Sequence, residues 1–283
     1  MPMTLLHRKA FTKWYCILFY LLFFFKLCNG MLLFQLQPHL FNLRFDMVTW
    51  LLMKTGLHQW LTDNPTGWIV FDASFYVLPL LYWLTYRKNM KAATALAFAM
   101  LIVNWVYVEC YTLYPTNSIE SYIAWLLFPC LFATASLKSF YYVLHGLRYF
   151  FLYFFVSAAV WKVVQHGVFN LEEMSGVLLY QHKEYLASSP HNWYSAIIYW
   201  LINHPAISYV LYAAAAICEG YFIIGFFTKK YDRYLIAIFG LFLIMDVLIM
   251  RIPYWEVCPF ILVLVYGKYS LCGDSKNEMI AEN

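Results

Sequence analysis

Residues 147–165 read LRYFFLYFFVSAAVWKVVQ, and this stretch decides the class of fold. From Tyr149 to Val164 the only charged residue is Lys162, which stands in a run of aromatic, aliphatic and small residues. About 20 apolar residues in a helix cross about 30 Å of hydrocarbon. A surface helix of a soluble protein is apolar along one stripe only. The stretch therefore predicts a helix that spans a lipid bilayer.

The composition of the whole chain agrees with this interpretation. Of its 283 residues 63% are hydrophobic and 12% are charged, whereas about 25% of residues are charged in soluble domains. This excludes a disordered tail and a nucleic-acid-binding arm, because both need a polar composition. The seven cysteines form no Cys-x-x-Cys pair, so we expect no disulfide framework.

Further apolar runs of similar length predict an all-α polytopic helix bundle, an integral membrane protein of one domain, 1–283, with about eight transmembrane spans. Arg251, Ile252 and Pro253 separate the last two spans, which are short and could instead form a helical hairpin. The expected spans are 13–35, 68–86, 92–114, 121–137, 149–165, 206–227, 235–250 and 254–269.

The positions of lysine and arginine predict the orientation of these spans, since cytoplasmic loops carry an excess of positive charge. With the N-terminus inside, thirteen of the nineteen basic residues fall inside, four fall outside and two fall within spans. We therefore expect cytoplasmic N- and C-termini. The expected location is the bacterial inner membrane, with the lipid bilayer as the surrounding partner and no nucleic acid bound.

Two long outer loops contain helical patterns of their own. In the first loop, 36–67, apolar residues recur at helical spacing until a turn at Asp63-Asn64-Pro65. In the second loop, Asn170 predicts the start of a helix that runs to Tyr185, and Ser189-Pro190 predicts the start of another. We expect amphipathic helices that lie at the outer face. Their apolar residues are Phe45, Val48, Leu51, Leu52, Leu57, Trp60 and Leu61 in the first loop and Trp193, Ile197, Trp200 and Leu201 in the second.

Ionisable residues within spans are the candidate functional residues, because a charge at mid-membrane costs about 2.5–3.5 kcal/mol and usually faces the bundle interior. The topology places Lys162 in the outward half of the membrane, where Glu109, Asp72 or Asp246 is its expected partner. Glu219 and Asp246 lie deeper. Lys26 is expected to extend its ammonium group to the interface. The ionisable residues within spans are Lys26, Asp72, Glu109, Lys162, Glu219 and Asp246.

These positions predict an outward-facing polar pocket around Lys162. A desolvated lysine can act as a base or nucleophile, whereas a lysine beside a carboxylate holds two helices together. Both alternatives remain open from the sequence. We assign Lys162, Glu109 and Asp246 as catalytic candidates. No spacing of histidine or cysteine predicts a metal site, and the cofactor-binding candidates are Asp72, Glu219 and Trp161.

The segment from Leu147 to Lys162 resembles the matching segment of vitamin K-dependent γ-carboxylases and of the related horizontally transferred transmembrane (HTTM) domain proteins. In those proteins an aromatic-rich helix runs through small residues into a lysine, and the shorter DoxX-like membrane proteins share this feature. A weaker likeness extends to about Lys268 and includes Glu219 and Asp246. The family's glycine before the lysine is Ala159 here, and its second basic residue is Trp161.

The resemblance implies that Lys162 is the base that works with reduced vitamin K on the non-cytoplasmic side. The first functional hypothesis is therefore quinone-linked redox or carboxylation-type chemistry around Lys162, with a quinone as the only cofactor that we consider. The second is a non-catalytic membrane subunit that stabilises a membrane or periplasmic protein partner. A small-solute transporter is less favoured, because the spans show no inverted repeat.

Overall fold

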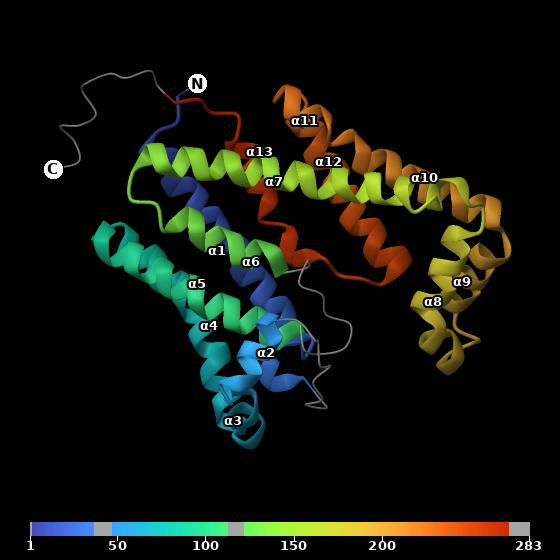
Figure 1. The fold of residues 1–283 in the computed structure, drawn as a ribbon, viewed down its shortest axis with the longest axis horizontal. Helices are drawn as coiled ribbons and strands as arrows, with labels where there is room; N and C mark the ends of the chain where they lie inside the picture. The colour runs from blue at the N-terminus through green and yellow to red at the C-terminus, as the bar shows by residue number, and fades with distance from the viewer. Residues whose placement is uncertain (1, 37–46, 113–121, 272–283) are drawn as a thin grey trace. The chain divides into compact units, whose positions relative to one another are not determined.

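A computed structural model describes residues 2–36, 47–112 and 122–271 of the chain, and these residues are almost entirely helical (Figure 1). The described residues contain no strand, and their one isolated β-bridge joins Pro2 to Ser270. The prediction of an all-α fold is confirmed. The helices are α1 (Leu5–Cys28), η1 (Leu33–Gln35), α2 (Met47–Lys54), α3 (Leu57–Asp63), α4 (Pro65–Tyr86), α5 (Met90–Thr112), α6 (Ile123–Phe132), α7 (Leu137–Val164), η3 (Gly167–Phe169), α8 (Glu173–Ser188), α9 (Trp193–Asn203), α10 (Pro205–Tyr221), α11 (Ile224–Phe227), α12 (Asp232–Met245), the π-helix η4 (Asp246–Met250), η5 (Trp255–Val257) and α13 (Phe260–Tyr266).

Six helical segments in the described part of the chain are long and apolar enough to cross a membrane. They indicate an integral membrane protein, and each coincides with one of the expected spans. The expected spans 121–137 and 254–269 contain shorter apolar helices instead, Ile123–Phe132 and Trp255–Gly267. The six long segments are Leu5–Gln35, Thr66–Tyr86, Met90–Tyr111, Leu137–Val164, Pro205–Phe227 and Asp232–Met250.

The chain divides into two compact units, which are described separately below. The first unit comprises Met1–Leu147 and Trp255–Asn283, and the second comprises Arg148–Tyr254. Helix α7 continues from one unit into the other, since its first residues belong to the first unit and the remainder to the second.

Aromatic rings fill the interior of the first unit. Helix α4 packs against α5, α5 packs against α6, and α1 contacts both α4 and α13. The rings of Phe75 in α4 and Tyr107 in α5 stack with their centroids 3.9 Å apart. Leu84 and Ile102, on the same two helices, are more than half exposed. This arrangement suits a membrane helix pair, whose outer surface contacts lipid and not water.

The beginning and end of the described chain meet in the first unit. The backbone N–H of Met3 donates to the carbonyl oxygen of Ser270 at 2.8 Å. The ring of His7 stacks on that of Tyr269 with centroids 3.9 Å apart. The start of α1 and the end of α13 therefore lie at the same end of this unit.

The first predicted outer segment forms two helices and not one. Helix α2 ends at Lys54 and α3 begins at Leu57, because Gly56 between them adopts a left-handed conformation with φ of 69°. Leu52 and Leu61 are buried, which agrees with the predicted apolar face. Phe45 lies outside the described residues.

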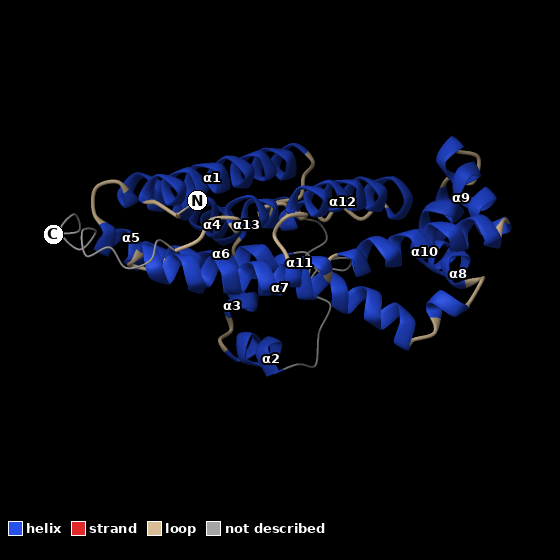
Figure 2. Cartoon of the chain, turned by 90° about the horizontal axis from the view of Figure 1, so that it is seen from above, coloured by secondary structure: helices blue, strands red, loops and turns tan. Residues whose placement is uncertain are grey.

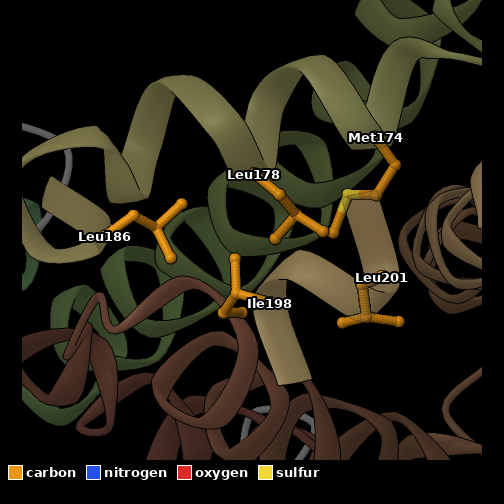
Figure 3. Packing of buried hydrophobic residues seen from close by; sticks show 5 residues of the cluster. All are labelled: Met174, Leu178, Leu186, Ile198 and Leu201. Carbon is orange, nitrogen blue, oxygen red and sulfur yellow. The ribbon is translucent and has the colours of Figure 1, made fainter. Parts of the chain in front are cut away.

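The second predicted outer segment also forms two helices, α8 and α9, and their packing is shown in Figure 3. Helix α9 begins later than Ser189-Pro190, because the side chain of Asn192 caps it by accepting from the backbone N–H of Tyr194 at 3.0 Å. Ile198 points toward Leu178 of α8, and Leu201 is also buried, whereas Trp193 and Trp200 are exposed. The cluster that joins α8 and α9 comprises Met174, Leu178, Leu186, Ile198 and Leu201.

The views agree that α8 and α9 lie beside the first part of α10 in the second unit (Figures 1 and 2). The carbonyl oxygen of Ile249 in η4 accepts from the imidazole Nε2 of His182 at 2.7 Å and from the hydroxyl of Tyr194 at 3.0 Å. Arg251 follows in a left-handed conformation, with its guanidinium 4.2 Å from the ring centroid of Tyr185. These contacts fasten η4 to α8 and α9.

Acidification should weaken this fastening. Burial, together with the positive charge of Arg251, lowers the pKa of His182, although its hydrogen bond to Ile249 acts in the opposite direction. A lowered pKa in the folded state means that folding favours the neutral imidazole. The neutral imidazole of His182 therefore stabilises the folded state above the ordinary histidine pKa of about 6.5. This contribution is lost as the pH falls below that value.

The measurement is thermal unfolding of the purified protein above and below pH 6.5, comparing wild type with His182→Gln. The variant should lose less stability on acidification than the wild type. Exposed His191 provides the matched control, since His191→Gln should retain the wild-type pH dependence. An equal acid-induced loss in wild type and His182→Gln would contradict the prediction.

Candidate functional site: two lysine–glutamate centres

The second unit contains an ion pair at the predicted lysine. Lys162 occupies the last turn of α7, and its Nζ lies 2.5 Å from both Oε1 and Oε2 of Glu219 in α10. The Lys162 side chain is 22% exposed and that of Glu219 is 3% exposed. The ring centroid of Tyr212 lies 5.8 Å from the same ammonium nitrogen. The pair therefore joins α7 to α10 at a position that is only partly accessible.

Asp246 adds a second carboxylate to this centre. It interacts electrostatically with both Glu219 and Lys162. Its Oδ2 is buried and has no hydrogen-bond partner among the described residues. Asp246 is also the first residue of the π-helix η4. Because π-helical turns within α-helices occur frequently at functional sites, we take Lys162, Glu219 and Asp246 together as the first candidate site.

The partner of Lys162 differs from the residues expected from the sequence, which were Glu109, Asp72 or Asp246. The reason is the register between α7 and α10. Ala159 faces Gly220, and the hydroxyl of Tyr209 donates to the carbonyl oxygen of Val168 at 2.6 Å. Helix α10 thus begins well beyond the end of α7. Glu219, which the topology placed deeper than the lysine, lies at its level.

Trp161 lies beside Lys162 in the sequence and is 60% exposed. The assignment of Trp161 to cofactor binding stays a prediction. Asp72 and Glu109 belong to the first unit, whereas Lys162, Glu219 and Asp246 belong to the second.

Asp72 has a structural environment of its own. Its carboxylate accepts from the hydroxyl of Tyr107 at 2.5 Å and from the backbone N–H groups of Leu33 and Phe34 at 3.4 and 2.9 Å. These bonds attach η1 to α4 and α5. Glu109 is 7% exposed and is likewise buried in the first unit.

The first unit contains a second lysine–glutamate pair, which the sequence analysis missed. The expectation that Lys26 reaches the interface was wrong, since this residue is 2% exposed. Its Nζ lies 2.5 Å from Oε1 of Glu256, and it donates to the hydroxyl of Tyr111 at 3.2 Å. Only long-range packing brings these residues together, because α1 and the segment of Glu256 are distant in sequence. The one available signal was that both residues fall in the outer halves of the predicted spans 13–35 and 254–269.

Aromatic rings surround the ammonium group of Lys26. The ring centroids of Tyr111, Tyr122 and Trp125 lie 4.7, 5.3 and 5.6 Å from its Nζ. A cation is attracted to the faces of such rings, with the strongest effect where water is excluded. The hydroxyl of Tyr111 also donates to the carbonyl oxygen of Met31.

Two arginines that the topology placed in inner loops are also buried. Arg148 donates from NH2 to Oδ1 of Asp232 at 2.7 Å and from Nε to Oδ2 at 3.4 Å, within the second unit. Arg8 donates to the carbonyl oxygen of Thr134 at 2.5 Å in the first unit, and its guanidinium lies 5.0 Å from the ring centroid of Phe140. Counting positive charges by loop does not reveal that these side chains turn inward.

An apolar cavity of about 480 Å³ lies among α2, α3 and α5 in the first unit. It is lined by residues such as Leu52, Trp60 and Trp105, and none of the ionisable candidates contributes to its wall. Within the described residues, no group of three or more histidine, cysteine, aspartate or glutamate side chains could hold a metal ion.

Comparison of the chain with protein-family models, with curated proteins and with solved structures found no match. The resemblance to γ-carboxylases and HTTM proteins therefore rests on the residues quoted for it. What the candidate sites do has to be argued from their geometry.

Proposed function

We propose that the protein is an integral membrane protein that carries out acid–base chemistry on a quinone at Lys162, Glu219 and Asp246. The observation that carries the proposal is the unpartnered Oδ2 of Asp246 beside the Lys162–Glu219 pair. Ionisable residues inside membranes are costly, so a buried carboxylate oxygen without a partner points to a functional role.

The proposed topology has eight spans, with cytoplasmic N- and C-termini in a bacterial inner membrane. The contact between Met3 and Ser270 supports it, because chain ends on one side of the membrane require an even number of crossings. Six crossings and eight crossings both meet this condition, and the proposed eight have the short apolar helices α6 and α13 cross as well. The thirteen-to-four distribution of basic residues supports cytoplasmic termini.

The chemical groups of the site suit a quinone. The ammonium of Lys162 has three hydrogen-bond donors, two of which reach Glu219, so one remains for a carbonyl oxygen. The Oδ2 of Asp246 can accept a hydrogen bond from a hydroxyl group. A quinone, when bound, would supply the two-electron redox chemistry. The protein would orient it, and Asp246 would accept or return a proton at Oδ2.

Oxidation of reduced menaquinone or ubiquinone in proteoliposomes tests this proposal, with dioxygen supplied as the two-electron acceptor. Asp246→Asn, which removes the proton acceptor, should lower the rate by at least about 10²-fold, the usual contribution of a general acid or base. Lys162→Met, which removes the donor to the quinone oxygen, should also lower the rate, while both variants remain inserted and folded. Lys183→Met, which removes an exposed lysine from α8, is the matched control and should retain activity. Full activity in Lys162→Met would sink the proposal.

A second candidate function is a non-catalytic subunit that stabilises partner proteins. The contact between Lys162 and both carboxylate oxygens of Glu219 favours this function, because such an ion pair holds α7 and α10 together. Purification in mild detergent should then recover a partner in fixed stoichiometry. A monodisperse monomer that is inactive toward quinones in every preparation would leave neither function supported.

A further inference from the structure

The order of elements in the first part of the chain recurs in the second. An aromatic-rich helix leads into a short 3₁₀ helix, then two short helices, then a long helix that begins at a proline. The first series comprises α1, η1, α2, α3 and α4, and the second comprises α7, η3, α8, α9 and α10. The spans show no inverted repeat in the sequence, and this recurrence in the same chain direction was missed there.

Matching residues mark the recurrence. The segment that leads into α4 and ends at its first residue reads Trp60-Leu61-Thr62-Asp63-Asn64-Pro65. The segment that leads into α10 in the same way reads Trp200-Leu201-Ile202-Asn203-His204-Pro205. Asn64 donates to the carbonyl oxygen of Trp60 at 2.8 Å, and His204 donates to that of Trp200 at 2.7 Å. Two different side chains therefore make the same local bond at equivalent positions.

The two buried lysines occupy equivalent positions in this recurrence. Lys26 lies two residues before the end of α1, and Lys162 lies two residues before the end of α7. Each is paired with a glutamate at 2.5 Å. Their partners come from different helices, because Glu219 lies on α10 whereas Glu256 lies on η5. The two lysines thus occupy equivalent positions in the two series, whereas their glutamate partners do not.

We propose that Lys26 and Glu256 form a second functional centre, which binds water and exchanges protons at Oε2 of Glu256. This oxygen is buried and has no hydrogen-bond partner among the described residues. Glu256 is 4% exposed. A proton that arrives through bound water forms an O–H bond at Oε2, and it leaves by the same route.

Other buried polar atoms accompany this oxygen. Tyr76 interacts electrostatically with Glu256, Tyr111 and Asp72. Its hydroxyl lies close to that of Tyr107, and Tyr76 is 5% exposed. The Oδ1 of Asn104 has no hydrogen-bond partner in the described chain, whereas its Nδ2 donates to the carbonyl oxygen of Trp125 at 2.8 Å.

A purely structural ion pair does not need this arrangement. Nearly all buried polar groups in native proteins have a partner, either protein or ordered water. A buried water molecule typically makes about three hydrogen bonds to such groups. A buried carboxylate oxygen without a partner, with the hydroxyl of Tyr76 in its electrostatic neighbourhood, therefore points to water as the ligand. Lys26 holds the other oxygen of Glu256, which leaves Oε2 as the exchanging atom.

This inference does not rest on the proposed function, because it uses none of the residues of the Lys162 site. The test is infrared difference spectroscopy of the full chain in liposomes, with glutamate labelled by ¹³C at the carboxyl carbon. As the pH is lowered, a labelled band of a protonated, buried carboxyl group should appear. It should shift when H₂O is replaced by D₂O, and it should be lost in Glu256→Asp.

Two further variants keep the test decisive. Glu184→Asp removes an exposed glutamate of α8 and should retain the band. Tyr76→Phe removes a single buried hydroxyl, leaves the Lys26–Glu256 pair intact, and should slow the exchange of the band into D₂O. The inference is overturned if wild type and Glu256→Asp give the same spectra at every pH. It is also overturned if Tyr76→Phe exchanges at the wild-type rate.

Discussion

Lys26→Met should lower the free energy of unfolding by about 3–5 kcal/mol, the range for removing one partner of a buried ion pair. The substitution would leave the carboxylate of Glu256, which is 4% exposed, without its cation. It would also remove the hydrogen bond to Tyr111 and the attraction to three aromatic rings. The apolar stem of methionine fills most of the space of the lysine stem. The loss of stability therefore measures the effect of removing the ammonium group.

Reversible unfolding in detergent measures this effect. Lys54→Met is the matched control, because Lys54 is exposed and lies 3.8 Å from the ring centroid of Trp50. It should cost about 1 kcal/mol or less, as exposed cation–π contacts do. The double variant Lys26→Met with Glu256→Gln should recover part of the lost stability, since no carboxylate then remains buried. A cost for Lys26→Met no larger than that of Lys54→Met would refute the prediction.

Arg148→Met should also lower the free energy of unfolding by about 3–5 kcal/mol. Arg148 is 1% exposed and Asp232 is 5% exposed. The guanidinium holds both carboxylate oxygens, in the forked geometry that makes arginine–carboxylate pairs strong. Removal of the arginine would leave the buried carboxylate at the start of α12 without its two hydrogen bonds, and only the attraction to the ammonium of Lys229 would remain.

A double-mutant cycle with Asp232→Asn isolates the contribution of this pair. The double variant should lose less stability than the sum of the two single losses, so the cycle should give a favourable coupling energy. Arg87→Met is the matched control, since Arg87 is exposed and lies 5.2 Å from the ring centroid of Trp83. Zero coupling between Arg148 and Asp232 would show that the contact contributes nothing to stability.

The positions of the long helices could be predicted from the sequence. The run at 149–165 became the second part of α7, and the run at 206–227 became α10 and α11. Apolar length is sufficient for this inference, because a bilayer core requires about 20 apolar residues whatever their order. The outer helices were predicted as well, with their ends displaced where Gly56 and Asn192 set local boundaries.

The sites were predicted less completely. The sequence selected Lys162, Glu219 and Asp246 because charges are rare within apolar runs, and the structure brings these three together. It assigned Lys162 the wrong partner and assigned Lys26 to the interface. Both errors came from assuming that helices begin and end at common levels and that a lysine near a helix end reaches water.

By itself, the sequence determined that this chain forms apolar helices and which residues carry charge within them. Only the tertiary structure decided which charges meet. A helix that is apolar on every side gives no signal of the face that turns inward, so the sequence does not distinguish Tyr76 from Val77 of α4, yet Tyr76 is buried and Val77 is exposed. Register and rotation are fixed by packing against neighbouring helices, and these place Lys26 on Glu256 and Lys162 on Glu219.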